Sequence, residues 1–412
     1  MYERLLVRYG DLSLKGKNKK VFINRVNNLI KEKLNEYNVT YEYAHDRLYI
    51  LLNGESHEDI IKGLDKVSGL HSYSLVSKCG LDLEEIKALA LKIVSGHLLE
   101  DKVVTFKVDS KRANKKFEIH SMELTQIISG YVLKNSKNLK TDVHNPNFTL
   151  HIEVRQDGVY MFTNQIKGVG GFPVGVGGKG LLMISGGIDS PVAGFLAMKQ
   201  GVEIECIHFE STPLTPIESA QKVIDLIEKL SEYAPKNRIK IHMVPFKDIH
   251  ETIINKVPEE YIITIMRRMM YRIASRVAQA NDILALINGE SVGQVASQTL
   301  ESMSVINSVT NMPVLRPLVT YDKNDIISIA RKIDTYETSI RPFQDCCTVY
   351  LPKFPVIKPQ LRKCEMFETH ADFNTLLEEC INNIKVVTVS SKNHLDITCS
   401  GFTVREALEF NE

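Results

Sequence analysis

A regular alternation of apolar runs and helical patterns fills the second half of this 412-residue chain and leaves few folds open to it. Such an alternation of strands and helices is typical of a parallel sheet with helices on both faces. We therefore predict an α/β domain over residues 180–412. Strands are expected at 181–184, 203–209, 239–244 and 283–287, and helices at about 190–200, 217–231 and 259–280.

A glycine-rich stretch precedes this domain. Seven of the thirteen residues from Gly168 to Gly180 are glycine, which favours an irregular loop or a linker. We place a linker at 166–179. The string at 175–180 fits GxGxxG, but it precedes its strand, whereas a dinucleotide-binding loop follows one.

The N-terminal half has two shorter patterns of mixed strands and helices, so we predict α+β domains at 1–60 and 61–165. The first reads β-α-β-β-α, one strand short of a ferredoxin-like unit. Its elements are expected at 5–7, 22–34, 39–43, 48–52 and 58–64. The second begins with a strand near Leu70 and continues with elements at 83–93, 103–108, 119–133, 149–154 and 159–163.

Positive charge is concentrated in two stretches of a nearly neutral chain. Residues 1–40 and 101–140 each carry nine Lys or Arg against four Asp or Glu, although the whole chain has a net charge of +1. Such stretches favour contact with a polyanion such as RNA, and the alternative is a solvated helix face. The candidate RNA-binding residues are Lys15, Lys17, Lys107, Lys111, Arg112, Lys115 and Lys116.

Several classes of protein are disfavoured. The longest apolar runs are far shorter than the roughly 18 residues of a membrane helix, and charges at Glu3, Arg4 and Arg8 interrupt any signal-peptide core. The seven cysteines are odd in number and form no CxxC pair, which argues against a secreted disulfide framework or a zinc ribbon. We expect a cytosolic protein without membrane contact.

One motif indicates a site that binds phosphate. The apolar run at 181–184 leads directly into Ser185-Gly-Gly-Ile-Asp189-Ser190, and Pro191 then suits the first turn of a helix. A helix start offers free N–H groups and a positive dipole to phosphate. Gly186 and Gly187 would admit an oxyanion, and the two serines would add hydroxyl donors. Asp189 would repel phosphate unless a cation such as Mg²⁺ lies between them. The alternative is an ordinary strand-to-helix turn with capping side chains.

The segment Ser185–Ser190 resembles the PP-loop of enzymes that cleave ATP between its α and β phosphates. Together with segments 208–211, 266–270, 288–299 and 316–318, it makes nearly the whole chain similar to the tRNA 4-thiouridine synthetase family, ThiI. The resemblance implies a C-terminal PP-loop ATP pyrophosphatase domain. It also implies N-terminal ferredoxin-like and THUMP domains that hold tRNA, in agreement with the two α+β patterns.

The resemblance also implies an ATP site and its cofactor. Asp189 would be catalytic and would bind Mg²⁺. The neighbouring Arg268, Arg272 and Arg276 share one helical face that could bind phosphate, RNA or nearby acids. The implied ATP-binding residues are Met183, Ile184, Ser185, Gly186, Gly187, Asp189, Ser190, His208, Phe209, Arg267, Gly289 and Gln298.

The implied reaction adenylates O4 of uridine-8 in tRNA and replaces this oxygen with persulfide sulfur. The Cys-x-Val pattern favours Cys347 as the sulfur carrier, and Cys346 remains an alternative. The 65 residues after Cys347 are too few for the rhodanese domain that some members add. Sulfur would then come directly from a cysteine desulfurase. We interpret the three cysteines that follow as structural, namely Cys364, Cys380 and Cys399.

Other implied properties are a homodimer and sulfur transfer to the carrier protein ThiS in thiamine thiazole synthesis. Two rival functions stay open. One is a different PP-loop adenylating enzyme, such as an amide-forming synthetase or a 2-thiouridine enzyme. The other is a tRNA-binding module with a vestigial nucleotide site.

Overall fold

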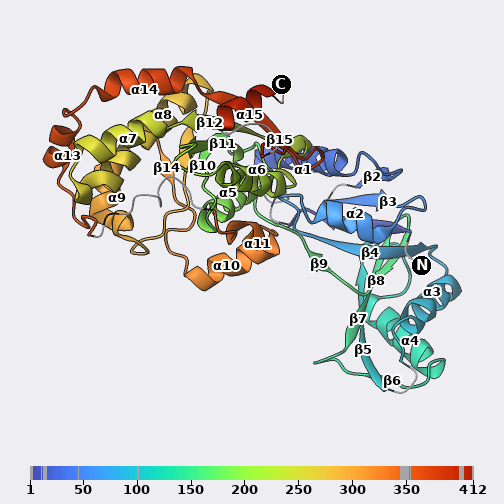
Figure 1. The fold of residues 1–412 in the computed structure, drawn as a ribbon. Helices are drawn as coiled ribbons and strands as arrows, with labels where there is room; N and C mark the ends of the chain where they lie inside the picture. The colour runs from blue at the N-terminus through green and yellow to red at the C-terminus, as the bar shows by residue number, and fades with distance from the viewer. Residues whose placement is uncertain are drawn as a thin grey trace. The chain divides into compact units, whose positions relative to one another are not determined.

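The computed structural model describes residues 3–10, 12, 16–44, 46–99, 102–343, 352, 354–398 and 403–410. The chain divides into two compact units, Met1–Gly171 and Phe172–Glu412 (Figure 1). Within the part of the chain described here, no helix is long and apolar enough to cross a membrane.

The first unit is built on a nine-stranded sheet with the order β2-β3-β1-β4-β8-β7-β5-β6, and β9 also pairs with β4. The strands are β1 (Arg4–Arg8), β2 (Thr40–Ala44), β3 (Arg47–Leu51), β4 (Ser72–Cys79), β5 (Val104–Arg112), β6 (Leu139–Thr141), β7 (Phe148–Arg155), β8 (Gly158–Phe162) and β9 (Ile166–Lys167). The helices are α1 (Lys19–Lys33), α2 (His57–Leu64), α3 (Leu83–Ser95) and α4 (Ser121–Lys134).

Strand β4 supplies the strand that the first pattern lacked. Its first part pairs antiparallel with β1, where Leu75 lies opposite Leu5, and its last residues, Ser77–Cys79, pair with β8. The expectation that this strand belongs to the second pattern alone was wrong. One strand belongs to both halves of the unit. It is eight residues long, which is enough to pair with different neighbours along its length.

The part of this sheet around β5 has one apolar face. Val104, Phe106 and Val108 alternate along β5 and pack with residues of α3 and α4 in a buried cluster. Because side chains alternate between the two faces of a strand, Lys107 and Lys111 point to the opposite face.

The second unit is a six-stranded sheet with the order β14-β13-β10-β11-β12-β15. Its strands are β10 (Lys179–Met183), β11 (Glu203–Glu210), β12 (Arg238–Pro245), β13 (Ala285–Ile287), β14 (Val314–Leu315) and β15 (Lys385–Ser390). Its helices are α5 (Asp189–Lys199), α6 (Ile217–Ser231), α7 (Lys247–Lys256), α8 (Ile262–Ala280), α9 (Leu300–Asn307), α10 (Lys323–Lys332), α11 (Tyr336–Ser339), α13 (Leu361–Phe367), α14 (Phe373–Asn382) and α15 (Val404–Phe410).

The sheet of the second unit is mostly parallel, as predicted, and has helices on both faces. Strands β10 to β14 pair in parallel, and β15 joins the edge antiparallel to β12. Leu181 belongs to the core beneath α7, α8 and α14. Leu182 faces the other way, because a Cβ on Gly194 of α5 would lie 2.6 Å from its Cδ2. The antiparallel edge strand was not foreseen.

The strand order creates a topological switch point beside β10. The chain runs from β10 to β11 and β12 on one side, and then returns to place β13 and β14 on the other side. In open α/β sheets, ligands bind at the carboxyl ends of strands at such a point. The loop Ser185–Ser190 follows β10 there, and Asn288–Glu290 follow β13.

Much of the predicted linker is fixed in place. Ile166 and Lys167 form β9, and the N–H groups of Gly175 and Gly177 both donate to the carbonyl of Gly201, at 2.8 and 2.9 Å. Gly175 has a φ of 98°, which other residues rarely adopt. The glycines therefore let an irregular segment pack against the second unit, and the division between the units falls at residue 171.

Candidate functional site

The carboxyl ends of β10, β11 and β13 open onto a cavity of about 470 Å³. Gly186 lies in the same loop but does not line this cavity. The other predicted ATP-binding residues all do, and these are Met183, Ile184, Ser185, Gly187, Asp189, Ser190, His208, Phe209, Arg267, Gly289 and Gln298.

The loop after β10 is closed by its two serines. The Ser190 hydroxyl accepts from the N–H of Ser185 at 2.9 Å and donates to the carbonyl of Ser185 at 3.1 Å. The Ser185 hydroxyl accepts from the N–H of Gly187 at 3.4 Å. The Ser190 hydroxyl thus shapes the loop in this structure, and the contact of either serine with a phosphate stays a prediction.

Gly187 and Gly289 differ in how much room the structure leaves for a side chain. A Cβ on Gly289 would lie 2.8 Å from the backbone carbon of Asp189 and from the nitrogen of Ser190, so the end of β13 supports the loop by close backbone contact. A Cβ on Gly187 would meet the Ser185 hydroxyl at an ordinary 3.6 Å. Packing thus requires glycine at 289. At 187 the structure leaves room for a side chain.

Asp189 has partners that sequence reasoning missed. Its Oδ1 accepts from Lys323 Nζ at 2.6 Å, and its Oδ2 accepts from Gln294 Nε2 at 3.2 Å. Lys323 begins α10 and is 134 residues away in the chain, so no local pattern pointed to it. The lysine adds positive charge beside the loop. A carboxylate that is partly open to solvent also fits Mg²⁺, which is commonly held by one or two carboxylates together with substrate phosphates.

A buried acid organises the cationic wall of the cavity. Glu290 is 2 % exposed, and its carboxylate oxygens lie 2.7 Å from Arg267 Nη2 and 2.7 Å from Arg316 Nε. Burial alone would raise the pKa of Glu290, but the two guanidinium groups and the Asn288 amide together lower it. The glutamate therefore stays ionised and fixes Arg267 at the cavity. Glu290 lies within a motif that suggested the family, but no role was predicted for it.

The polar groups at the cavity differ in whether they already have hydrogen-bond partners within the protein. Gln298 Oε1 is buried and has no hydrogen-bond partner among the described residues. Arg267 Nη1 donates to the Ser297 hydroxyl at 3.3 Å. The two backbone groups of Ile184 are both engaged, since its N–H donates to Ile207 and its carbonyl lies 3.1 Å from His208 Nδ1. The Ile184 carbonyl can still accept a second hydrogen bond, so the predicted contact of Ile184 with the nucleotide stays a prediction.

The arginine face of α8 binds nearby acids. Arg268 is 2 % exposed, and its Nε lies 2.5 Å from Glu368, which also accepts from Arg272 at 2.9 Å. Arg276 pairs with Glu378 at 2.6 Å. Of the three interpretations that the sequence left open, the structure supports the one with acidic partners.

The predicted RNA-binding residues of the first unit are mostly at the surface. Lys17, Lys111, Lys115 and Lys116 are exposed, and Lys107 is half-buried. Lys15 lies outside the described residues.

Arg112, also half-buried, has a local structural contact. It donates from Nη1 to the carbonyl of Phe117 at 2.9 Å and so closes the turn that carries Lys115 and Lys116.

The five cysteines considered in the sequence analysis fall into two groups. Cys346, Cys347 and Cys399 lie outside the described residues. Cys364 and Cys380 are buried in the core of the second unit. Burial raises the pKa of the Cys364 thiol to about 11 and that of Cys380 to about 12. Both thiols are therefore protonated and unreactive near neutral pH, which agrees with a structural role.

A glycine-containing loop and a helix start at the switch point of a mostly parallel sheet, faced by an ion-paired arginine, define an α/β protein equipped to bind an anionic ligand. Three family models match this chain. The model described as "Thiamine biosynthesis protein (ThiI)" matches residues 175–373, the ThiI ferredoxin-like domain matches 4–74, and the THUMP domain matches 81–164.

Curated relatives match almost the full chain. A "Probable tRNA sulfurtransferase" of Acholeplasma laidlawii is 48% identical over 408 residues, with 99% of this chain and 98% of the relative covered. One of the same name from Bacillus licheniformis is 48% identical over 389 residues, with 94% and 96% covered. The chain therefore belongs to the ThiI family of tRNA sulfurtransferases.

Solved structures agree with this assignment. A 4-thiouridine synthetase, crystallised as an RNA complex with bound ATP, has a TM-score of 0.87 and 36% identity, and the match covers 95% of this chain and 100% of that chain. PH1313 from Pyrococcus horikoshii has a TM-score of 0.62 and 22% identity, covering 81% of this chain and 99% of that one, which shows a similar fold.

Proposed function

We propose that this protein uses ATP to adenylate O4 of uridine-8 in tRNA and then replaces that oxygen with sulfur to give 4-thiouridine. The observation that carries the proposal is the cavity at the switch point, where the loop after β10 and the helix start of α5 meet Arg267 and the unpartnered Gln298 Oε1. The 4-thiouridine synthetase that resembles this chain was crystallised with RNA and ATP, which supports both ligands.

The loop would hold the phosphates of ATP. Its N–H groups and the positive end of α5 favour an anion, and Arg267 and Lys323 add positive charge on the cavity and loop sides. Attack by uridine O4 on the α-phosphate releases pyrophosphate, and these groups stabilise the charge that develops. Gln298 Oε1 can accept a hydrogen bond from the nucleotide.

Asp189 would hold Mg²⁺ together with the phosphates, and the ion, when bound, supplies further charge to the leaving pyrophosphate. Lys323 Nζ lies 2.6 Å from the Asp189 carboxylate. When that carboxylate binds Mg²⁺, Lys323 would bind a phosphate oxygen instead.

Sulfur transfer would use a persulfide on Cys347, with Cys346 as the alternative carrier. The terminal persulfide sulfur attacks C4 of the adenylated uridine, and AMP leaves with the former carbonyl oxygen. This step gives a mixed disulfide between C4 and the cysteine. A thiol from outside the site then breaks the sulfur–sulfur bond, so that C4 keeps one sulfur and the cysteine becomes part of a disulfide with that thiol.

The first unit would select tRNA through its exposed lysines, because such clusters contact phosphates without reading sequence. We further propose a cysteine desulfurase as sulfur donor and a homodimer as the working form. The description of the matching family model supports a second outlet for the persulfide, transfer to the ThiS carrier for thiamine synthesis.

Mass spectrometry of tRNA nucleosides from cells that lack this protein tests the proposal. We expect selective loss of 4-thiouridine, restored by the wild-type chain and not by Asp189→Ala. Unchanged 4-thiouridine in the deletion strain would contradict the proposal. Full activity on a small acyl acceptor without residues 1–165 would favour an amide-forming relative, and absence of ATP cleavage with tRNA would favour a vestigial site.

The same measurement separates the two adjacent cysteines. We expect Cys347→Ser to abolish 4-thiouridine and Cys346→Ser to retain part of it. The reverse result would assign the carrier role to Cys346.

A further inference from the structure

A buried lysine on α6 is tied to the segment that precedes the adjacent cysteines. Lys222 is 5 % exposed, and its Nζ donates to the carbonyl of Phe343 at 2.5 Å and to the carbonyl of Arg341 at 3.4 Å. Phe343 precedes Cys346 by three residues in the chain. Burying an ammonium group is costly unless acceptors surround it, and an apolar side chain would avoid that cost. We therefore infer that the function of a lysine at this position is to bind these two carbonyls.

The next turn of α6 holds the same segment by its side chain. Asp225 is paired through Oδ2 with the guanidinium group of Arg341, and its Oδ1 accepts from Gln221 Nε2 at 2.7 Å. Arg341 is thus fixed to α6 through both its carbonyl and its guanidinium group. Two separate polar contacts at one residue restrict rotation as well as position.

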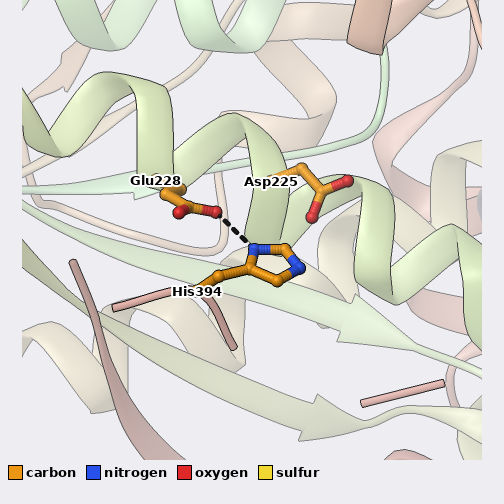
Figure 2. A group of neighbouring side chains, drawn as sticks. All are labelled: Asp225, Glu228 and His394. Atoms are coloured by element: carbon orange, nitrogen blue, oxygen red, sulfur yellow. Dashed lines mark hydrogen bonds and ion pairs between the residues drawn. The ribbon is translucent and has the colours of Figure 1, made fainter. Parts of the chain in front are cut away.

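Gln221 extends this network to a second segment near the C-terminus. Its amide donates to the carbonyl of Leu395 at 2.9 Å, and its Oε1 accepts from the N–H of Ile397 at 2.8 Å. Glu228 accepts from His394 Nδ1 at 2.9 Å, as Figure 2 shows beside Asp225. Helix α6 therefore anchors residues 341–343 and 394–397 along one polar stripe.

The geometry of this stripe favours an anchor over a metal site. Ligand atoms of Asp225, Glu228 and His394 lie within 4.8 Å of one another, which could suit a cation. However, both carboxylate oxygens of Asp225 already accept from Gln221 and Arg341. These side chains are committed to fixing chain segments.

The other end of the anchored segment reaches the loop after β10. Ser339, the last residue of α11, donates from its hydroxyl to the carbonyl of Gly187 at 3.4 Å. Residues 339–343 therefore run from the proposed ATP loop to Lys222. Any cysteine that follows within a few residues starts from a point fixed relative to that loop, since each residue adds at most about 3.6 Å of reach.

We propose that Lys222 is a positioning residue for the sulfur-transfer step, because it fixes the carbonyls of Arg341 and Phe343, which precede the two cysteines in the chain. This inference rests on the proposed function, because it assigns a role within the second half of that reaction. It predicts that loss of the Lys222 ammonium separates the two half-reactions. Adenylation, which takes place at the loop, should continue, and delivery of sulfur should slow.

The test compares Lys222→Met with the wild type and with Lys229→Met. Lys229 is the matched control, because it lies on the same helix and pairs with Asp334 instead of the carbonyls of 341 and 343. Pyrophosphate release and 4-thiouridine formation are measured in a single turnover on the same purified proteins with tRNA and a persulfide donor. For Lys222→Met we expect thiolation to fall roughly 10- to 100-fold, as for a misplaced reacting group, with pyrophosphate release and the KM for ATP unchanged.

Lys222→Arg should recover most of the thiolation rate, since it keeps a charged donor, and Lys229→Met should match the wild type. An equal fall of both half-reactions in folded Lys222→Met, or the same split in Lys229→Met, would overturn the proposal. If Lys222→Met does not fold, Asp225→Asn provides the second variant, and a folded Asp225→Asn protein with no split would also overturn it. Absence of 4-thiouridine in the wild-type reaction would instead refute the proposed function.

Discussion

Arg267 and Arg268 are adjacent on α8 and share the same side-chain chemistry, yet they belong to different parts of the molecule. Arg267 reaches the cavity and is held there by Glu290. Arg268 is buried on another side of the helix, where Glu368, the carbonyl of Val305 and the Ser308 hydroxyl take up its donors. One step of about 100° around a helix separates the two environments.

These two arginines show that an ion pair can either stabilise the fold or hold a side chain at a cavity. The Arg268 guanidinium is surrounded by acceptors from its own chain, so it links α8 to α9 and α13 and leaves little capacity for a ligand. Arg267 shares Glu290 with Arg316 and still lines an open cavity. We therefore expect substitutions at Glu368 to reduce stability, and substitutions at Arg267 to reduce nucleotide binding.

The largest expected effect is on stability at Glu368. Glu368→Ala leaves the buried Arg268 without its acid, and loss of one partner of a buried pair costs about 3–5 kcal/mol. Urea unfolding followed by circular dichroism measures this change. Replacing both partners, as Arg268→Met with Glu368→Met, should recover much of the loss. A loss below about 1 kcal/mol for the single variant would contradict a buried structural pair.

Arg267→Met should act on nucleotide binding. A hydrogen bond to a charged group contributes about 1.5–3 kcal/mol, so we expect the KM for ATP to rise roughly 10- to 100-fold, with a smaller loss of stability because Arg316 still neutralises Glu290. Pyrophosphate release at varied ATP gives the KM. Arg268→Met is the matched control, for which the folded protein should keep its KM. The opposite pattern in the two variants would reverse the assignment of the two arginines.

The pH dependence of stability should reveal the acid at the cavity. The folded-state pKa of Glu290 is lowered, so its ionisation stabilises the fold above its ordinary pKa of about 4.3, and this contribution is lost as pH falls through the lowered folded pKa. Glu290→Gln removes the contribution. We expect the unfolding free energy of the wild type to be higher than that of the variant, with the largest difference at pH 7. This difference should shrink below about pH 4. A difference that grows on acidification would contradict the ionised pair.

The smallest effect is expected at the exposed end of the arginine face. The side chains of Arg276 and Glu378 are 41% and 63% exposed in their pair, and exposed pairs contribute about 0.2–1 kcal/mol. Arg276→Ala should therefore change the unfolding free energy by less than about 1 kcal/mol and leave the KM for ATP unchanged. A loss as large as that of Glu368→Ala would show that the whole face acts as one network.

Local sequence patterns were sufficient for the strand, loop and helix of the proposed nucleotide site, because β10, the loop and α5 are consecutive. The switch point was not predicted, because the alternation of strands and helices does not give the order of the strands in the sheet. Partners from distant segments could not be predicted. Lys323 beside Asp189 and Glu368 beside Arg268 come from segments 134 and 100 residues away. Strand β4 was misassigned because a sequence pattern shows a strand but not which neighbours it pairs with.

The anchoring role proposed for Lys222 could likewise not be predicted from the sequence. On α6 this lysine occurs in an amphipathic pattern among other charged residues, and such residues usually lie in solvent. Its burial depends on two backbone carbonyls that lie 119 and 121 residues further along the chain. The resemblance to a known family suggested residues for the reaction, and the structure shows the contacts of those that it describes; their roles stay predictions.

We propose above all that the loop between β10 and α5 positions ATP for transfer of AMP to a tRNA uridine. Analysis of the nucleotide products during a single turnover with unmodified tRNA tests it most directly. We predict one AMP and one pyrophosphate for each 4-thiouridine formed, with no product in Asp189→Ala. Formation of ADP and phosphate, or of 4-thiouridine without ATP cleavage, would contradict the claim.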